Sequence, residues 1–188
     1  MTSDEITPKT DLPFNFGLAS TRDTFLYTCE RPGGDPGAEG GGGSSKLLSR
    51  MEAQPQIDFL RQRAVQNVLI LLDDKELEHY EEPGLIQLYE RAGIQVHRQP
   101  MGEEGAAQNI LKIIQQMESN QQPIAAHCTH GMGRSGRVAA AWVSARYGLS
   151  PEEATMEVMD WARSEGIQRM GNANKLEEWL GGANLTEG

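Results

Sequence analysis

The stretch Pro123-Ile-Ala-Ala-His-Cys-Thr-His-Gly-Met-Gly-Arg-Ser-Gly136 decides the fold that this sequence predicts. Pro123–His127 is a short, mostly apolar run of the kind that forms a buried strand. The following Arg134–Tyr147 is strongly apolar and rich in alanine, which indicates a helix, and Gly148 is suited to end it. A strand that enters a short glycine-containing loop and leaves it as a helix is typical of an open α/β sheet.

The rest of the chain repeats this alternation of strand and helix patterns. Strands are expected over residues 24–29, 67–72 and 94–97, and helices over residues 56–63, 85–92, 106–117, 154–164 and 175–180. Pro55 is expected to open the first of these helices, and Ser150 with Glu153 forms the pattern of a capping box. The predicted fold class is therefore α/β, with a mostly parallel central sheet flanked by helices.

The length of 188 residues fits a single domain. Residues 1–14 are polar and interrupted by proline, and we interpret them as a flexible N-terminal tail. The domain is expected over residues 15–183, with a glycine-rich loop at 33–45, and a short C-terminal tail at 184–188 follows it. The glycine-rich loop is not a domain boundary, because the roughly 30 residues before it are too few to fold alone.

Composition and charge limit the partners and the location of the protein. The formal net charge of −10 disfavours broad binding to nucleic acid, because a phosphate backbone needs a field of Lys and Arg. No apolar run approaches the length of a membrane span, and the acidic N-terminus lacks the apolar core of a secretory signal. We therefore expect a cytoplasmic protein with no membrane partner. Its two cysteines, Cys29 and Cys128, are too few for a disulfide framework.

The loop after Cys128 has the features of an anion-binding site. Gly131 and Gly133 can adopt dihedral angles that turn backbone N–H groups inward, at a helix N-terminus that favours negative charge. Arg134 can add a bidentate guanidinium fork to the same anion. These groups also favour the reactive thiolate of Cys128, so one geometry binds a phosphate dianion and activates its attacker. The sequence thus predicts covalent catalysis through a cysteinyl-phosphate, with the Ser135 hydroxyl easing departure of the thiolate.

Simpler explanations of the cysteines stay open at this point. A buried cysteine before a glycine-rich turn can be plain packing between a strand and a helix. His127, Cys128 and His130 can also be metal ligands, but three ligands within four residues at a strand end rarely converge on one ion. We therefore expect neither a metal nor another cofactor. Cys29 is most simply a packing residue of its strand, with a redox partnership to Cys128 as the alternative.

The motif His127-Cys128, five residues, and Arg134-Ser135-Gly136 resembles the signature of the cysteine-based protein tyrosine and dual-specificity phosphatases. Further segments are similar to the cyclin-dependent kinase-associated phosphatase group: Leu77-Glu-His-Tyr80, Pro83-Gly-Leu-Ile-Gln-Leu-Tyr89, Gly93-Ile94, His97 and Pro100. The resemblance implies a protein tyrosine phosphatase-like fold, Cys128 as nucleophile, Arg134 as phosphate ligand and His127 as a residue that orients the loop. It implies that the phosphate lies against His127, Thr129, His130, Gly131, Met132, Gly133 and Arg134.

The sequence departs from that family in its general acid. The family supplies an aspartic acid from a mobile loop, but the corresponding residues Gln99–Gly105 contain no Asp. By position Glu103 is the expected acid and Glu104 the next candidate. Asp73 and Asp74, which follow an expected strand, are alternative acids, although residues in that place often cap the next turn.

The expected function is hydrolysis of phosphomonoesters in proteins, on phosphotyrosine and, according to the depth of the pocket, on phosphoserine and phosphothreonine. The resemblance implies a cyclin-dependent kinase as a partner. Asn172 stands where related enzymes often place a glutamine that positions water, and Gln168 is the alternative. An RNA 5′-phosphatase remains open, because His127–Gly131 also resembles the start of that signature. A phosphoprotein- or kinase-binding module with weak turnover remains open as well, because the aspartic acid is missing.

Overall fold

The computed structural model describes residues 5–6, 13–34 and 46–181. Most of the glycine-rich loop expected at 33–45, and the C-terminal tail expected at 184–188, lie outside the described residues.

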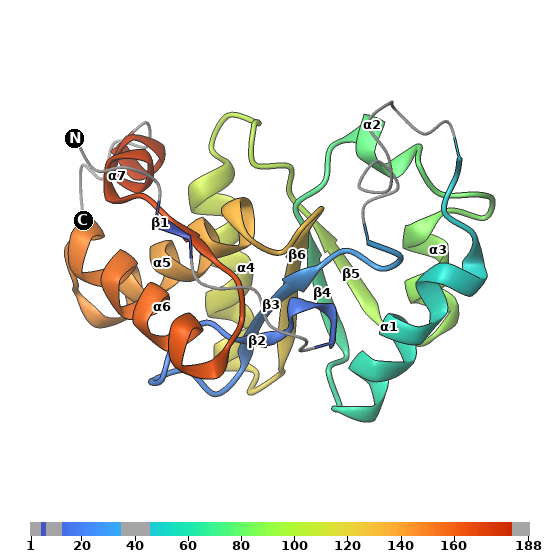
Figure 1. The fold of residues 1–188 in the computed structure, drawn as a ribbon, viewed down its shortest axis with the longest axis horizontal. Coiled ribbons are helices and arrows are strands. Elements are labelled where there is room, and N and C mark those ends of the chain that lie inside the picture. The colour runs from blue at the N-terminus through green and yellow to red at the C-terminus, as the bar shows by residue number, and fades with distance from the viewer. Residues whose placement is uncertain (1–4, 7–12, 35–45, 182–188) are drawn as a thin grey trace.

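Five strands form a central sheet in the order β2-β3-β6-β4-β5 (Figure 1). In that order they are β2 (Gly17–Leu18), β3 (Leu26–Glu30), β6 (Ile124–Cys128), β4 (Asn67–Ile70) and β5 (Gln95–Arg98). β2 runs antiparallel to β3, and the other neighbouring pairs are parallel. The predicted α/β class with a mostly parallel sheet is therefore confirmed.

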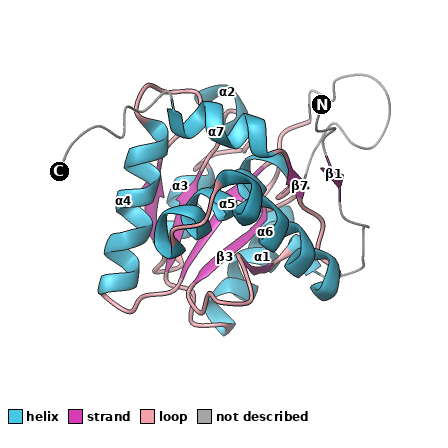
Figure 2. Ribbon diagram, turned by 90° about the vertical axis from the view of Figure 1, so that its left-hand side faces the viewer, coloured by secondary structure: helices cyan, strands magenta, loops and turns pink. Residues whose placement is uncertain are grey.

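Helices cover both faces of this sheet (Figures 1 and 2). One layer holds α4 (Ala106–Ser119), α5 (Gly133–Tyr147), α6 (Pro151–Glu165) and α7 (Ala173–Gly181), the other holds α1 (Arg50–Gln62) and α3 (Leu85–Arg91), and the short α2 (Asp74–Leu77) follows β4. Alternation along β4 divides the core in two, because Leu69 packs with the α4–α5 layer whereas Val68 and Ile70 pack with α1 and α3. Among the described residues, no helix has both the length and the apolar character needed to cross a membrane.

The start of α1 differs from the prediction. The helix begins at Arg50 rather than beside Pro55, which lies inside it. Ser49 is the N-cap, its side chain accepts from the Glu52 backbone N–H, and the Glu52 carboxylate accepts from the Ser49 backbone N–H. This capping box satisfies N–H groups at the helix start, so it sets the boundary instead of the proline. The capping box predicted at Ser150 and Glu153 is present at the start of α6.

The described part of the expected N-terminal tail is built into the fold. Glu5–Ile6 forms β1, which pairs antiparallel with β7 (Met170–Gly171). Pro13–Asn15 forms a short 3-10 turn, and the Phe14 ring packs edge-on against Phe59 of α1. These contacts to distant parts of the chain hold residues whose local sequence alone suggested a loose segment.

Candidate active site

Cys128 is the last residue of β6, and the strand aims its side chain at the layer of α5. Ala126 and Cys128 belong to the core under α5, whereas Ala125 belongs to the core under α1 and α3. α5 begins at Gly133, so four residues form the turn between strand and helix. We call Cys128–Arg134 the phosphate loop. The Cys128 side chain is almost fully buried, and its Sγ lies 3.2 Å from the Oγ of Ser135, which donates to it.

Two glycines allow the phosphate loop and its helix to approach neighbouring strands closely. Gly131 has φ +67°, and a Cβ at this position would collide with the backbone of Cys29 and Glu30 on β3. A Cβ on Gly136 would lie 2.6 Å from the carbonyl oxygen of Met170 on β7. The loop is therefore seated against β3, and the first turn of α5 against β7.

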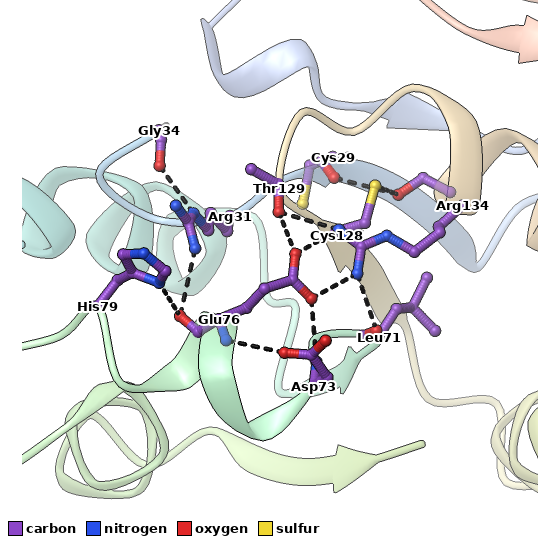
Figure 3. Close-up of polar contacts among 11 residues, drawn as sticks. Cys29, Arg31, Gly34, Leu71, Asp73, Glu76, His79, Cys128, Thr129 and Arg134 are labelled. Atoms are coloured by element: carbon purple, nitrogen blue, oxygen red, sulfur yellow. Dashed lines mark hydrogen bonds and ion pairs between the residues drawn. The ribbon is translucent and has the colours of Figure 1, made fainter. Parts of the chain in front are cut away.

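Arg134 is held in place by a carboxylate that the sequence did not single out (Figure 3). Its Nη1 and Nη2 donate to the two carboxylate oxygens of Glu76 at 2.7 and 2.6 Å. Nη2 also donates to Oγ1 of Thr129 at 2.9 Å, and the Thr129 hydroxyl donates to Glu76 at 2.5 Å. Nη1 makes a longer bond of 3.3 Å to the Leu71 carbonyl. Every hydrogen bond of Arg134 to the described chain uses Nη1 or Nη2, so its Nε remains for a bound anion.

Local structure explains how Glu76 reaches this position. Asp73 is the N-cap of α2, and it exchanges two hydrogen bonds with Glu76 in a capping box. Burial raises the pKa of Glu76, but the hydrogen bonds from Arg134 and Thr129 outweigh it and hold the pKa at about 2. The hydrogen bond to Glu76 raises the pKa of Arg134 in turn. The pair is thus fully charged at neutral pH. The spacing of Asp73 and Glu76 after a strand is a sequence signal for the helix cap that positions Glu76, although not for its pairing with Arg134.

His127 lies behind the loop rather than in the cleft above it. Its side chain is fully buried, and its ring lies 5.8 Å from the ring of Tyr89 on α3. Neither ring nitrogen has a hydrogen-bond partner among the described residues. Burial, helped by the charges of Arg31 and Arg134, lowers the pKa of His127 to about 3, so the ring is neutral. The expectation that His127 contacts the phosphate does not agree with this placement, because alternation along β6 turns its side chain to the α3 layer.

A cleft lies over the phosphate loop. Its lining residues are Cys128, His130, Met132, Gly133, Arg134, Arg137 and Met170. Five of these were predicted from the sequence as substrate-binding or catalytic. Thr129 and Gly131 do not line the cleft, because the Thr129 hydroxyl bonds to Glu76 and Gly131 packs on β3. Arg137 was missed, although it lies three residues after Arg134 on one helix, where side chains are neighbours.

Of the acid candidates near Arg134, Glu103 is the one whose carboxylate neither caps a helix nor forms an ion pair with another described residue. Glu103 lines a second cleft, which meets the cleft over the phosphate loop at Arg134. This second cleft also includes Asp73 and Asp74 but not Glu104. The amide Nε2 of Gln99 donates to Oε2 of Glu103 at 2.8 Å. In contrast, the Asp73 side chain caps α2, and Asp74 forms an ion pair with Arg98 at 2.7 Å.

The two candidates for placing water have structural partners. Oδ1 of Asn172 accepts from the backbone N–H of Lys175 in the first turn of α7 at 3.0 Å. The backbone of Gln168 forms hydrogen bonds with the side chain of Asn15, at 2.7 and 2.9 Å. Neither residue lines the cleft over the phosphate loop.

Cys29 is a buried residue of β3, in register with His127 of β6. Its Sγ lies 3.6 Å from the amide Nε2 of Gln56, and burial raises its pKa to about 12. At neutral pH the side chain is therefore a thiol that packs in the core. The described residues contain no group of three or more His, Cys, Asp or Glu side chains placed to hold a metal ion.

The model of the Tc-R-P family, described as a DSP-PTPase phosphatase of polymorphic toxin systems, matches residues 42–147. Cyclin-dependent kinase inhibitor 3 of Sus scrofa is 30% identical over 138 residues, and the human protein of that name is 28% identical. Each match covers 69% of this chain, and the chain spans 64% of the length of these curated relatives.

Solved structures show the same fold. Kinase associated phosphatase (KAP), with its catalytic-site cysteine replaced by serine, has a TM-score of 0.71 at 23% sequence identity. That match covers 95% of this chain and all of the other. Tk-PTP in its active form has a TM-score of 0.63 at 23% identity, over 90% of this chain and 95% of that one. The protein tyrosine phosphatase-like fold implied by the signature is thereby confirmed.

Proposed function

The chain belongs to the Tc-R-P family of DSP-PTPase phosphatases, and on that premise we propose that it removes phosphate from phosphorylated proteins through a cysteinyl-phosphate on Cys128. The observation that carries the proposal is the convergence of Cys128 and Arg134 on one cleft at the start of α5. Ser135 donates to the sulfur, and Glu76 holds the guanidinium by its outer edge. A thiolate and an anion ligand thus meet where a helix N-terminus favours negative charge.

The first step of the proposed reaction transfers phosphate to sulfur. The Cys128 thiolate attacks phosphorus while the bond from phosphorus to the leaving oxygen breaks. Arg134 binds the phosphate oxygens through its Nε edge, because its Nη atoms are occupied by Glu76, Thr129 and the Leu71 carbonyl. Glu103 gives a proton to the leaving oxygen from Oε1, since Oε2 accepts from Gln99.

The second step regenerates the enzyme. Glu103, now a carboxylate, takes a proton from a water molecule that attacks phosphorus, and the bond between phosphorus and sulfur breaks. The sulfur leaves as a thiolate, and the Ser135 hydroxyl, 3.2 Å away, stabilises it by a hydrogen bond. Inorganic phosphate is the product.

The proposed substrate is a phosphorylated protein kinase, which is also the proposed partner. Support comes from the curated relatives named cyclin-dependent kinase inhibitor 3 and from the structural likeness to kinase associated phosphatase. Phosphotyrosine is the proposed residue, with phosphoserine and phosphothreonine as further substrates. A cytosolic location belongs to the same proposal, because a reducing compartment would keep Cys29 and Cys128 as the free thiols they are here.

Hydrolysis of para-nitrophenyl phosphate in excess chelator tests the proposed chemistry. We expect turnover by the wild type, and a loss of at least about 10⁴-fold in Cys128→Ser, because a hydroxyl is a far weaker nucleophile at neutral pH. Cys29→Ser is the matched control, since it makes the same change in a cysteine that does not line the cleft. It should retain most of the activity.

Other outcomes separate the alternatives. A wild type that is inert while Cys128→Ser binds phosphopeptides would identify a binding module instead of an enzyme. Faster release of phosphate from RNA 5′ ends than from phosphopeptides would identify the RNA 5′-phosphatase. Equal activity of wild type and Cys128→Ser would remove Cys128 from the reaction.

A further inference from the structure

Three consecutive carbonyl groups of the phosphate loop accept hydrogen bonds on its outer side. The His130 and Gly131 carbonyls accept from the side-chain amide of Asn15, with Nδ2 at 3.2 and 3.3 Å. The Met132 carbonyl accepts from the backbone N–H of Gly136 at 2.9 Å and from that of Met170 at 3.3 Å. Three consecutive carbonyls are therefore fixed, two of them by one side chain that is more than 110 residues away in sequence.

The direction of these carbonyls sets the direction of the N–H groups. In a planar trans peptide the C=O and the following N–H point opposite ways. Holding the His130 and Gly131 carbonyls outward therefore turns the N–H groups of Gly131 and Met132 toward the cleft. Within the described chain, neither of these two N–H groups donates to a backbone carbonyl. They are the inward-facing dipoles that an anion nest requires.

Asn15 is itself rigidly held. The backbone N–H of Gln168 donates to Oδ1 of Asn15 at 2.7 Å, which fixes which end of the amide is the donor. Nδ2 donates to the Gln168 carbonyl at 2.9 Å, so its second hydrogen is left for the two loop carbonyls, His130 and Gly131. The φ of Asn15 is +50°, a left-handed conformation that asparagine tolerates better than most residues.

A buried arginine connects Asn15 to the central sheet. Arg169 is only 1% exposed, and its Nη2 donates to the Asn15 carbonyl at 3.0 Å. The same guanidinium donates to the hydroxyl and the carbonyl of Thr28 on β3, at 2.9 and 2.8 Å. β3 lies beside β6, the strand that delivers Cys128 (Figure 1). Arg169 therefore fixes Asn15 to β3, the strand next to the one that carries the loop.

We propose that Asn15 is a positioning residue for phosphate binding, which acts by holding the His130 and Gly131 carbonyls away from the cleft. The inference rests on the proposed role of this loop as the phosphate site. Arg169 supports Asn15 from the buried side. A segment that precedes the first strand of the central sheet thus sets the orientation of N–H groups at the centre of the fold.

Binding of tungstate, a phosphate analogue that needs no turnover, tests this role by isothermal titration calorimetry. Asn15→Asp keeps the shape of the side chain, the tolerance of positive φ and the acceptor for Gln168, but it replaces the amide donors with a carboxylate oxygen. We expect the Kd for tungstate to rise by about 10- to 100-fold, because oxygen would face oxygen and the loop peptides would turn. Asn15→Gly removes the donors without adding charge, and we expect about a 10-fold rise.

Asn120→Asp is the matched control. It makes the same change of charge at the exposed C-cap of α4, which precedes the amino end of β6, whereas the phosphate loop follows the carboxyl end of that strand. Its tungstate affinity should equal that of the wild type. Thermal unfolding of each protein is measured in parallel, so that a variant that fails to fold is recognised and the other Asn15 variant is used.

The outcomes distinguish this inference from the proposed function. Unchanged tungstate affinity in a folded Asn15→Asp or Asn15→Gly protein would overturn the role of Asn15. A wild type that binds tungstate but does not hydrolyse para-nitrophenyl phosphate would overturn the enzyme proposal alone. A weaker tungstate affinity in the Asn15 variants would still support the role of Asn15 in that case. A wild type that binds no tungstate would overturn both.

Discussion

The phosphate loop and the acid loop, Gln99–Gly105, lie at the carboxyl ends of β6 and β5, and the chain holds them in opposite ways. The phosphate loop is fixed on every side, by Asn15 on its carbonyls, by Glu76 on Arg134 and by backbone packing at Gly131. The acid loop is exposed from residue 102 to residue 105. Among the described residues, the carboxylate of its candidate acid, Glu103, accepts one side-chain hydrogen bond, from Gln99.

The difference follows from what each loop has to do in the proposed reaction. The phosphate loop recognises one charged group, and its dipoles stabilise the transition state only if they are already aligned when charge develops. The acid loop has to deliver a proton to leaving groups whose position varies with the substrate. Gln99 nevertheless guides Glu103, because Gln99 is buried and is itself held in place. The Oε1 of Gln99 accepts from the Asn109 side chain at 3.1 Å.

Among the variants that compare the two loops, replacement of Arg134, in the fixed phosphate loop, by lysine should have the largest effect on activity. Lysine keeps the charge but loses the planar fork, and its three N–H donors lie on a single nitrogen. It therefore cannot pair side-on with both Glu76 oxygens while a separate edge faces the phosphate. We expect kcat/KM for para-nitrophenyl phosphate to fall by about 10³-fold, with tungstate affinity reduced as well. Steady-state kinetics and calorimetry measure the two effects.

Arg146→Lys serves as the control for that variant. Arg146 lies in the last turn of the same helix and pairs with Glu118 at 2.7 Å on the protein surface. Its replacement should leave kcat/KM within about twofold of the wild type. Comparable kinetics in Arg134→Lys would mean that charge alone suffices, and the rigid description of the phosphate loop would be wrong.

Replacement of Glu103 by glutamine should have a smaller effect that depends on the leaving group. Glutamine keeps the bond to Gln99 but has no proton to give, so kcat/KM for a phosphotyrosine peptide should fall by about 10²-fold. The effect on para-nitrophenyl phosphate should be less than about 10-fold, because its leaving group needs little protonation. The ratio of the two effects is the measurement that assigns the acid.

Glu104→Gln is the matched control on the neighbouring residue, which does not line the cleft with Arg134. It should behave as the wild type on both substrates. If instead Glu104→Gln shows the dependence on leaving group and Glu103→Gln does not, the acid loop adopts another arrangement during turnover. The contrast between a fixed and an exposed loop would then be sharper than this structure shows.

The local features of the site could be predicted from the sequence, whereas the contacts between distant residues could not. The strand, turn and helix around Cys128 are local, so apolar runs and two glycines were enough to predict them. Asn15 and Glu76 act on the loop from 115 and 58 residues away, and nothing in their local sequence indicates the partner. The start of α1 is a different case, since its signal, the capping box of Ser49 and Glu52, is local but lies upstream of Pro55, from which the helix was predicted to start.

The smallest expected effect concerns His127, which lies behind the phosphate loop, and it is measured as a change in the free energy of unfolding. Burial, with the charges of Arg31 and Arg134, lowers the pKa of His127 to about 3, whereas the unfolded value is about 6.5. Between these values the unfolded chain binds a proton that the folded chain does not. The free energy of unfolding is therefore unaffected by this ring well above pH 6.5, and it falls as the pH is lowered from 6.5 toward 3. From pH 7.5 to pH 5 this one ring should reduce the free energy of unfolding by about 2 kcal/mol.

His127→Phe should remove that contribution. Phenylalanine keeps a ring against Tyr89 and has no buried nitrogen without a partner, so the fold should persist at pH 7.5. Urea unfolding at pH 7.5 and pH 5 should show a loss that is about 2 kcal/mol smaller than in the wild type. Some loss remains, because burial also lowers the pKa of His97. The contribution of Glu76, whose pKa of about 2 lies below its unfolded value near 4.5, is lost mainly below the range measured. Equal losses of unfolding free energy in the two proteins would mean that His127 accepts a proton in the folded state. The surroundings of His127 behind the phosphate loop would then be more polar and less rigid than the contrast between the two loops requires.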